Sequence, residues 1–365
     1  MSKAGCSRIG AALFSTLAVF WGCVQVARGD YTYGEPTKVP NVSMPGAHSA
    51  QISRDGLELY FSYGTPNECG DLWVARRSTT KEAWGTPVPL DPPVNSPGPA
   101  GGVCISADRL ELYFGENHPV YWTAGCAPRP GGLGNGDLWV SKRATRADPW
   151  GNSENLGPAV NSARWDDHPS ISADGLSLYF VSNRAAGGDL GNLFVTTRLT
   201  KNDPWGPAVP VGAPIASWGE ASPFISADGL SLFYAAGGFT ADIKVSRRAT
   251  TTAPWDKPVP FTLVNSPGAE YHLSFSTEDS TLYFTRADNA LAVFDLYQVR
   301  LLPIVDFNAD GKVDLVDLVM LIDNWGSNKT LCDIGPYAWG DGKVDIEDLK
   351  VFMTYYEKEN PPVKP

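Results

Sequence analysis

The sequence predicts a mostly β fold, an all-β five-bladed β-propeller with a small C-terminal α-helical module. Three observations predict it: five copies of one hairpin pattern, 37 glycines and 30 prolines among 365 residues, and an acidic repeat near the C-terminus. Repetition at a fixed period is typical of propellers and solenoids, and many glycines and prolines fit a fold with many tight turns. The expected regions are a signal peptide over 1–29, the propeller over 30–303, the helical module over 304–358 and a tail over 359–365.

The N-terminus has the pattern of a secretory signal peptide. Lys3 and Arg8 supply positive charge before an apolar run over 11–21, which is short for a bilayer span. Small residues precede Asp30, the expected first residue of the mature chain. A lipoprotein signal at Cys23 is the alternative. We therefore expect a bacterial protein that is secreted or held at the cell surface.

The chain carries a net charge of −11. This balance argues against a nucleic-acid partner, because few cations are available to replace phosphate counterions. An excess of carboxylates suits calcium better. After the signal peptide no segment is apolar enough to predict a membrane-spanning helix.

Four cysteines follow the expected cleavage site: Cys69, Cys104, Cys126 and Cys332. Export permits disulfides. Cys69 and Cys126 lie in loop-like stretches of neighbouring repeats, so they are the expected pair. The alternative, that all four are free, stays open because connectivity does not follow from sequence.

Each repeat reads as three strands and a short fourth. A first strand ends in a step such as Ile-Ser, the chain turns at Asp-Gly or a related pair, and an alternating strand such as LELYF or LSLYF follows. Alternation buries one face of a strand, and Asp-Gly marks a tight turn. A third strand and a Trp-Gly element with a Pro/Val stretch complete the unit. The turns begin at Ile52, Ile105, Ile171, Ile225 and Phe275.

The last repeat lacks the Trp-Gly element, which is found instead at the start, as YGEPTKVPNVS over 33–43. A propeller closes well when its N-terminal segment supplies the outer strand of the last blade, because this protects sheet edges. We therefore predict four-stranded blades, the fifth completed by 33–43. A sixth blade without the pattern is the alternative.

The unit HPSISADGLSLYFVSNR over 168–184, with GNLFV over 191–195, resembles the WD40-like PD40 repeats of TolB-type bacterial propellers. All five units match that pattern to some degree. The resemblance implies a propeller that serves as an interaction platform. Enzymes share the architecture, so function must be argued from the site.

Polar residues precede each first strand and are expected to line one mouth of the central channel. Three of the four histidines lie there, His48, His168 and His272, and converging polar groups predict a ligand site. The alternative is that they are hydrogen-bonded side chains in a wet channel. A catalytic reading needs two carboxylates, as glycoside hydrolysis does. The acids in this register are Asp166, Asp167, Glu220 and Glu270.

Two recurring residue types have structural explanations. Aspartates in the hairpin turns are expected to cap those turns, and tryptophans at a fixed place in each blade are expected to pack between blades. Blade two also carries an insert over 116–136 without a strand pattern, and long loops of this kind are often functional. The aspartates are Asp55, Asp108, Asp174 and Asp228, and the tryptophans are Trp84, Trp150, Trp205 and Trp255.

The stretch DFNADGKVDLVDL places oxygen ligands at the spacing of a calcium-binding EF-hand loop. Calcium takes six to eight oxygens, which a twelve-residue loop can supply. Counting from Asp306, Gly311 falls at position 6, where the chain must turn sharply. A helix with apolar residues at helical spacing follows. The predicted ligands are Asp306, Asn308, Asp310, Lys312 through its carbonyl oxygen, Asp314 and Asp317.

A second, altered copy follows, in which GDGKVDIEDL matches ADGKVDLVDL. Tyr337 and Trp339 stand where positions 1 and 3 would fall, and neither supplies a carboxylate. We therefore expect Asp333 to take position 1, with 335–339 bulging out, and a weaker site. The predicted ligands are Asp333, Asp341, Lys343 through its carbonyl oxygen, Asp345 and Asp348.

Two calcium loops, each followed by one helix and each with Asp at position 12, resemble a type I dockerin domain over 306–356. The resemblance implies a cohesin domain as partner, bound through the helices. Positions 10 and 11 are Leu315-Val316 and Ile346-Glu347, and their difference argues against two equivalent binding modes. The alternative is a calcium-stiffened module without a cohesin partner.

The leading interpretation is a secreted, dockerin-bearing propeller. It binds a protein or glycan ligand at its channel and docks onto a cohesin with the help of Ca²⁺, in an extracellular polysaccharide-degrading system, the context that dockerin resemblance implies. A glycoside hydrolase that uses the channel carboxylates is the alternative. A structural adhesion protein of the cell surface is the second alternative.

Overall fold

A computed structural model describes most of the chain. The described residues are 31–33, 35–64, 70–95, 98–116, 129–184, 191–215, 219–276, 278, 280–287, 293–308, 310–329, 331–335 and 342–361. The predicted signal peptide, Cys69, Cys126 and Asp341 lie outside them, as do Tyr337, Trp339 and the last four residues of the tail.

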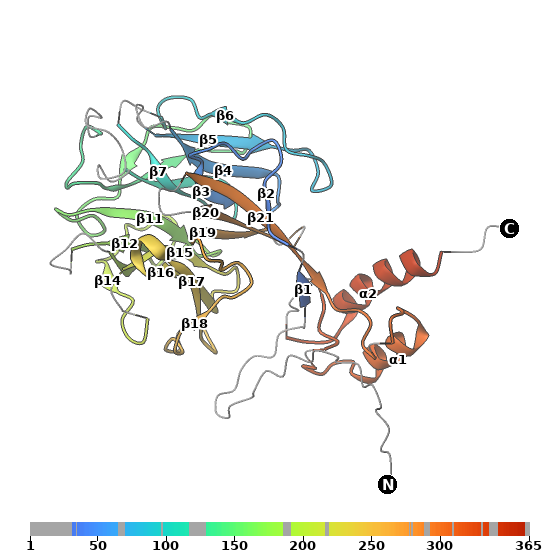
Figure 1. Cartoon of the computed structure of the whole chain (residues 1–365). Coiled ribbons are helices and arrows are strands. Elements are labelled where there is room, and N and C mark those ends of the chain that lie inside the picture. Colours follow the sequence, from blue (N-terminus) through green and yellow to red (C-terminus); the bar gives the residue numbers. More distant parts are fainter. Residues whose placement is uncertain are drawn as a thin grey trace, which may run out of the picture.

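The predicted five-bladed propeller is confirmed: the described strands form five antiparallel sheets, each one blade (Figure 1). Within a blade the strands follow one another from the axis outward. Blade one holds β3 (His48–Ile52), β4 (Glu58–Tyr63), β5 (Asp71–Arg76) and β6 (Val88–Pro89). Blade two holds β7 (Gly101–Ile105), β8 (Glu111–Gly115), β9 (Leu138–Lys142) and β10 (Glu154–Asn155).

The next two blades repeat this order. Blade three holds β11 (Asp166–Ile171), β12 (Ser177–Ser182), β13 (Asn192–Thr197) and β14 (Val209–Pro210). Blade four holds β15 (Glu220–Ile225), β16 (Ser231–Ala236), β17 (Asp242–Arg247) and β18 (Val259–Pro260), with a short 3-10 turn at Gly238–Thr240.

Blade five joins the two ends of the propeller. Its first three strands are β19 (Ala269–Ser276), β20 (Thr281–Ala287) and β21 (Phe294–Pro303). The N-terminal strands β1 (Tyr31–Tyr33) and β2 (Thr37–Lys38) both pair with β21, with Thr37 opposite Gln298. The predicted closure by the N-terminal segment is therefore confirmed.

The innermost strands β3, β7, β11, β15 and β19 contact one another in a closed ring. Apolar clusters fill the spaces between blades, and the predicted tryptophans belong to them. Trp84 of blade one meets Tyr283 of blade five at 6.2 Å between ring centroids, and an arginine of its own blade, Arg77, lies 4.2 Å above its ring. Trp205 and Trp255 meet tyrosines of the preceding blades in the same way.

The hairpin-turn aspartates cap their turns as expected. Asp55 Oδ1 accepts from the Ser53 hydroxyl at 2.7 Å and from the Leu57 N–H at 3.3 Å, and Asp108, Asp174 and Asp228 repeat the pattern. Gly56 follows Asp55 with a φ of 70°, which glycine adopts without steric cost.

The C-terminal module contains two helices, α1 (Leu315–Asp323) and α2 (Ile346–Glu359), drawn beyond the end of β21 in Figure 1. A small apolar core joins them. It holds Val305, Phe307, Val313, Leu321, Cys332, Ile334, Val344 and Phe352.

Cys104 and Cys332 are free and buried. No helix within the described ranges is long and apolar enough to cross a membrane.

Candidate functional site

All five inner strands share one irregularity near the axis. The ladder to the neighbouring strand shifts register at the same point in each blade, and the residue in this bulge has a left-handed backbone. Bulges re-aim side chains and are common beside functional sites. The bulge residues, with their φ angles, are Ser49 (58°), Gly102 (51°), His168 (52°), Ser222 (50°) and His272 (52°).

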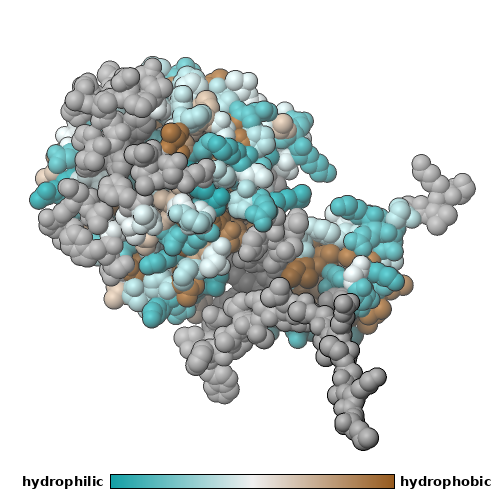
Figure 2. All heavy atoms as spheres, in the orientation of Figure 1, coloured by the Kyte–Doolittle hydropathy of each residue, from teal (hydrophilic) through white to brown (hydrophobic). Residues whose placement is uncertain are grey.

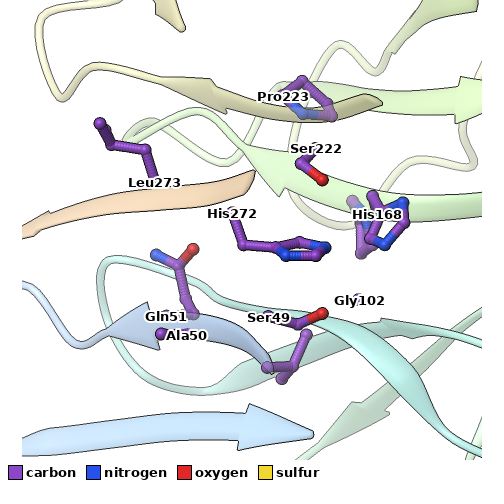
Figure 3. Close-up of a pocket in the computed structure, with 11 residues that line it drawn as sticks. Ser49, Ala50, Gln51, Gly102, His168, Ser222, Pro223, His272 and Leu273 are labelled. Atoms are coloured by element: carbon purple, nitrogen blue, oxygen red, sulfur yellow. The ribbon is translucent and has the colours of Figure 1, made fainter. Parts of the chain in front are cut away.

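These five residues line a pocket on the propeller axis, here called the axial pocket (Figure 3). Its remaining lining residues are the next one or two along each strand, Gln51 and Pro169 among them, and none is charged. Its volume of about 20 Å³ suits a water molecule, which needs roughly 10–15 Å³, or a single ion. A whole sugar ring does not fit.

Figure 3 shows the His272 imidazole pointing toward His168, with Ser49 and Ser222 nearby. The ring centroids of His168 and His272 are 4.6 Å apart, and those of His48 and His272 are 6.1 Å apart. Several buried polar atoms here have no hydrogen-bond partner in the described part of the chain: both ring nitrogens of His272, Nδ1 of His168, and the hydroxyls of Ser49 and Ser222. Such atoms are costly unless a water or an ion satisfies them.

Burial keeps these imidazoles neutral. It lowers the pKa of His48 and of His168 to about 4. The pKa of His272 is lowered well below its ordinary value by burial and then by the other two histidines. His48 does not line the axial pocket; its Nδ1–H donates to the carbonyl of Gly46 at 3.1 Å. Of the three histidines that the sequence predicts at the channel, His168 and His272 line the axial pocket and His48 lies outside it.

Two of the four candidate carboxylates form buried ion pairs. Asp166 bonds Arg184 Nη2 at 2.5 Å, and Glu270 bonds Arg286 Nε at 2.9 Å. Both acids are fully buried. Each also accepts from the backbone N–H of a serine four residues earlier, and each arginine donates to the carbonyl of a valine in the same loop, Val160 or Val264. The pairs thus tie each inner strand to the loop before it.

The other two candidate carboxylates are also buried. Asp167 Oδ1 accepts from the His168 N–H at 2.6 Å, and this carboxylate lies against Gly102 and Gly115 of blade two. Glu220 is 1% exposed, and its charge helps burial to raise the pKa of Tyr234. None of the four acids lines the axial pocket.

Sequence reasoning missed a carboxylate pair at the two ends of the blade-two insert. A Cβ atom on Gly132 would lie 3.1 Å from Asp137 Oδ2 and 3.7 Å from Glu116 Oε2, so both acids border one spot. Burial raises the pKa of Glu116, and the charge of Asp137 adds to this effect. The Arg129 N–H, which donates to Glu116 Oε1, lowers the same pKa but does not offset the rise. The length of the insert was the one signal in the sequence that pointed to this place. The sequence did not show that the two ends of the insert bring Glu116 and Asp137 together.

In the first acidic loop, carboxylates are held by backbone N–H groups. Asp306 Oδ2 accepts from Gly311 at 2.8 Å. Asp317 is fully buried; its Oδ1 accepts from Phe307 at 2.7 Å and its Oδ2 from Asp314 at 2.9 Å. Asp314 in turn caps α1, because its side chain accepts from the backbone N–H of Val316, the second residue of the helix.

The second loop repeats these bonds. Asp333 Oδ2 accepts from Gly342 at 2.8 Å. Asp348 Oδ1 accepts from Ile334 at 2.6 Å and its Oδ2 from Asp345 at 2.6 Å. Asp333 therefore accepts from the glycine of its loop as Asp306 does in the first loop; its role as a calcium ligand stays a prediction.

The donor chemistry of both loops fits a calcium ion. All predicted ligands are oxygens, and each carboxylate oxygen that accepts one N–H keeps a lone pair for a metal. Backbone bonds of this kind orient metal-ligating carboxylates. Among the described residues, no three His, Cys, Asp or Glu side chains are grouped closely enough to hold a metal ion, so calcium binding by the aspartates of these loops stays a prediction.

Helix α1 carries an exposed apolar surface, here called the α1 face. Figure 2 shows brown, hydrophobic spheres on the surface of the helical module. Each member is between 47% and 61% exposed. The members are Leu315, Val316, Val319 and Ile322 on the helix and Trp325 just after its end. Ile346 at the start of α2 is the counterpart of Leu315.

No protein-family model matches the chain, and no curated protein matches it. Solved structures are similar in fold. A thermostable family-43 glycoside hydrolase has 13% identity and a TM-score of 0.48, over 72% of this chain and 91% of its own. A GH43 endo-arabinanase from Bacillus licheniformis has 16% identity and a TM-score of 0.47, over 70% of this chain and 93% of its own.

TolB from Acinetobacter baumannii has 12% identity and a TM-score of 0.42, over 70% of this chain. This chain spans 56% of the length of that TolB. At such identities only the fold is shared.

Proposed function

We propose that this chain is an exported docking protein. Its C-terminal module binds calcium and attaches the propeller to a cohesin-type domain in an extracellular polysaccharide-degrading system. The main support for the proposal is the exposure of the apolar side chains that form the α1 face.

Helix α1 has apolar residues on two sides. Leu321 is buried in the module core, whereas Leu315, Val319 and Ile322 are exposed at the i, i+4, i+7 spacing of one helix face. Contiguous exposed apolar surface is typical of interaction sites, and a helix with such anchors suits a hydrophobic partner surface.

Calcium and the α1 face are connected through the helix start. Asp317 is a predicted calcium ligand and is also the third residue of α1, where its side chain accepts from the Asp314 N–H in a capping box. Calcium binding is coupled to folding when the ligands are brought together only in the folded state. Loss of calcium should therefore loosen the first turn of α1, which presents Leu315 and Val316.

In this proposal the propeller is the domain that the C-terminal module attaches to the cohesin-type partner. Its axial pocket has no charged lining residue and holds little more than a water molecule, so a protein or glycan ligand would contact the mouth of the channel and not enter the pocket. The strands β1 and β2 pair with β21, so the first and last strands of the propeller are joined in one sheet.

Substitution within the α1 face tests the proposal. Val319→Asp in the full chain should weaken binding to a cohesin panel at least a hundredfold in calcium. Val259→Asp is the matched control, since Val259 is 50% exposed on blade four and Val319 is 55% exposed. Equal affinities of the two variants would contradict a docking role for α1.

A glycoside hydrolase is the second candidate, favoured by Glu116 and Asp137. Glycosidases pair an acid of raised pKa with an ionised carboxylate, and the pKa of Glu116 is raised beside Asp137. Release of reducing ends from a polysaccharide panel, abolished by Glu116→Gln but not by Glu154→Gln at the exposed Glu154, would support it. If the wild-type protein released no reducing ends from any polysaccharide of the panel, this candidate function would be contradicted.

A further inference from the structure

Two of the five left-handed bulge positions carry a histidine where glycine would also serve. A φ near +50° is uncommon for residues other than glycine, and blade two shows that glycine serves there, at Gly102. Blades three and five instead place His168 and His272 at this position, and both rings enter the axial pocket. The two imidazoles therefore lie where they can meet a ligand on the axis.

The separation of the two rings fits one shared metal ion. A Zn²⁺ ion lies about 2.0–2.1 Å from an imidazole nitrogen, so two rings on one ion have centroids about 5.2 Å apart at a tetrahedral angle and about 4.5 Å apart at a right angle. His168 and His272 are 4.6 Å apart, whereas His48 is 6.1 Å from His272. The geometry thus gives two histidine ligands and no third, in agreement with the lack of a three-residue His, Cys, Asp or Glu site among the described residues.

The pocket also has the right donors and the right size. Both nitrogens of His272 and Nδ1 of His168 are buried without a hydrogen-bond partner in the described part of the chain. Neutral imidazole is a preferred ligand of zinc, copper and nickel. The hydroxyls of Ser49 and Ser222, likewise without a partner there, can accept a hydrogen bond from a water molecule bound to the ion.

We infer that the axial pocket binds one divalent transition-metal ion of the zinc, nickel and copper class between His168 and His272. The ion lies on the axis of the propeller and links inner strands β11 and β19, which are not neighbours in the ring of blades. It is distinct from the calcium loops, whose donors are all oxygens. The inference does not depend on the docking function.

Calorimetric titration of the full chain with Zn²⁺, in excess calcium to fill the oxygen loops, tests this inference. One zinc ion per chain is expected. Co²⁺ should develop visible absorption bands typical of nitrogen ligands. Replacing both histidines by asparagine, which tolerates positive φ, should weaken zinc binding at least tenfold. His118→Asn, at the remaining histidine outside the described residues, is the control for adventitious binding.

Zinc binding that survives in the His168→Asn/His272→Asn variant would overturn the inference, because the ion would then lie elsewhere. Absence of zinc binding by the wild-type chain would overturn it as well and leave water in the pocket. If the double variant fails to fold, His272→Asn alone decides: it must lose the Co²⁺ bands while its unfolding midpoint without metal stays near that of the wild type.

Discussion

Asp333 occupies in the second acidic loop the place that Asp306 occupies in the first. Oδ2 of each carboxylate accepts a backbone N–H from the glycine at the sharp turn, at 2.8 Å in both cases. The glycine follows Asp306 by five residues but follows Asp333 by nine. The second loop thus keeps its first carboxylate by accommodating four extra residues.

This equivalence predicts two calcium ions per chain, one for each loop. Asp306→Asn and Asp333→Asn should each remove one ion, because a neutral amide loses the charge that attracts calcium. Calorimetric titration with Ca²⁺ measures the stoichiometry, and Asp323→Asn at the exposed end of α1 is the control. Two ions still bound to Asp333→Asn would show that the second loop does not use this carboxylate.

The Glu270–Arg286 ion pair should stabilise the folded propeller. Glu270→Gln leaves the arginine charge buried beside a neutral amide, so the free energy of unfolding should fall by about 3 kcal/mol. Urea unfolding measures the change. Glu347→Gln, which breaks the exposed pair with Lys350, should change it by less than about 1 kcal/mol; an equal effect of the two substitutions would refute a structural role for Glu270.

Gly115 should not tolerate a side chain. A Cβ atom there would overlap Asp167 Oδ1, so Gly115→Ala must displace a buried carboxylate and should cost roughly 1–3 kcal/mol of stability. In the Asp167→Ala background, Gly115→Ala should cost much less stability, because the carboxylate that it would displace is gone. Additive losses in this double-mutant cycle would mean that the two residues do not interact.

The buried histidines should make the propeller less stable in mild acid. Unfolded histidines gain protons below about pH 6.5, whereas His168 does so only below about pH 4. In this window the unfolded state binds more protons, so lowering the pH reduces the free energy of unfolding, by about 1 kcal/mol per pH unit for each histidine. His168→Asn should show a shallower decline between pH 6.5 and 4, and an unchanged slope would contradict the burial of this ring.

Most of the fold could be predicted from sequence because each blade repeats the same local signals. The Asp55-Gly56 turn, the alternating strand after it and the tryptophan at Trp84 each specify a feature that the structure contains. Even the closure followed from the missing fifth Trp-Gly element, since an unpaired edge on the last blade needs a strand from elsewhere.

The axial pocket was harder to predict, because the bulge decides which side chain faces the axis. Sequence alone placed Asp166, Asp167 and His168 together at the channel mouth. The register shift after Asp167 turns His168 into the pocket and leaves Asp167 against blade two. A one-residue change in register reverses the facing of a side chain, and no local signal marked these bulges.

Binding of the full chain to a panel of cohesin domains, measured in calcium and again after addition of EDTA, tests the central proposal most directly. The proposal predicts tight binding to at least one cohesin in calcium, a large loss of affinity in EDTA, and recovery when calcium is restored. Failure to bind any member of a broad panel in calcium, or binding that EDTA leaves unchanged, would contradict calcium-dependent docking through the α1 face.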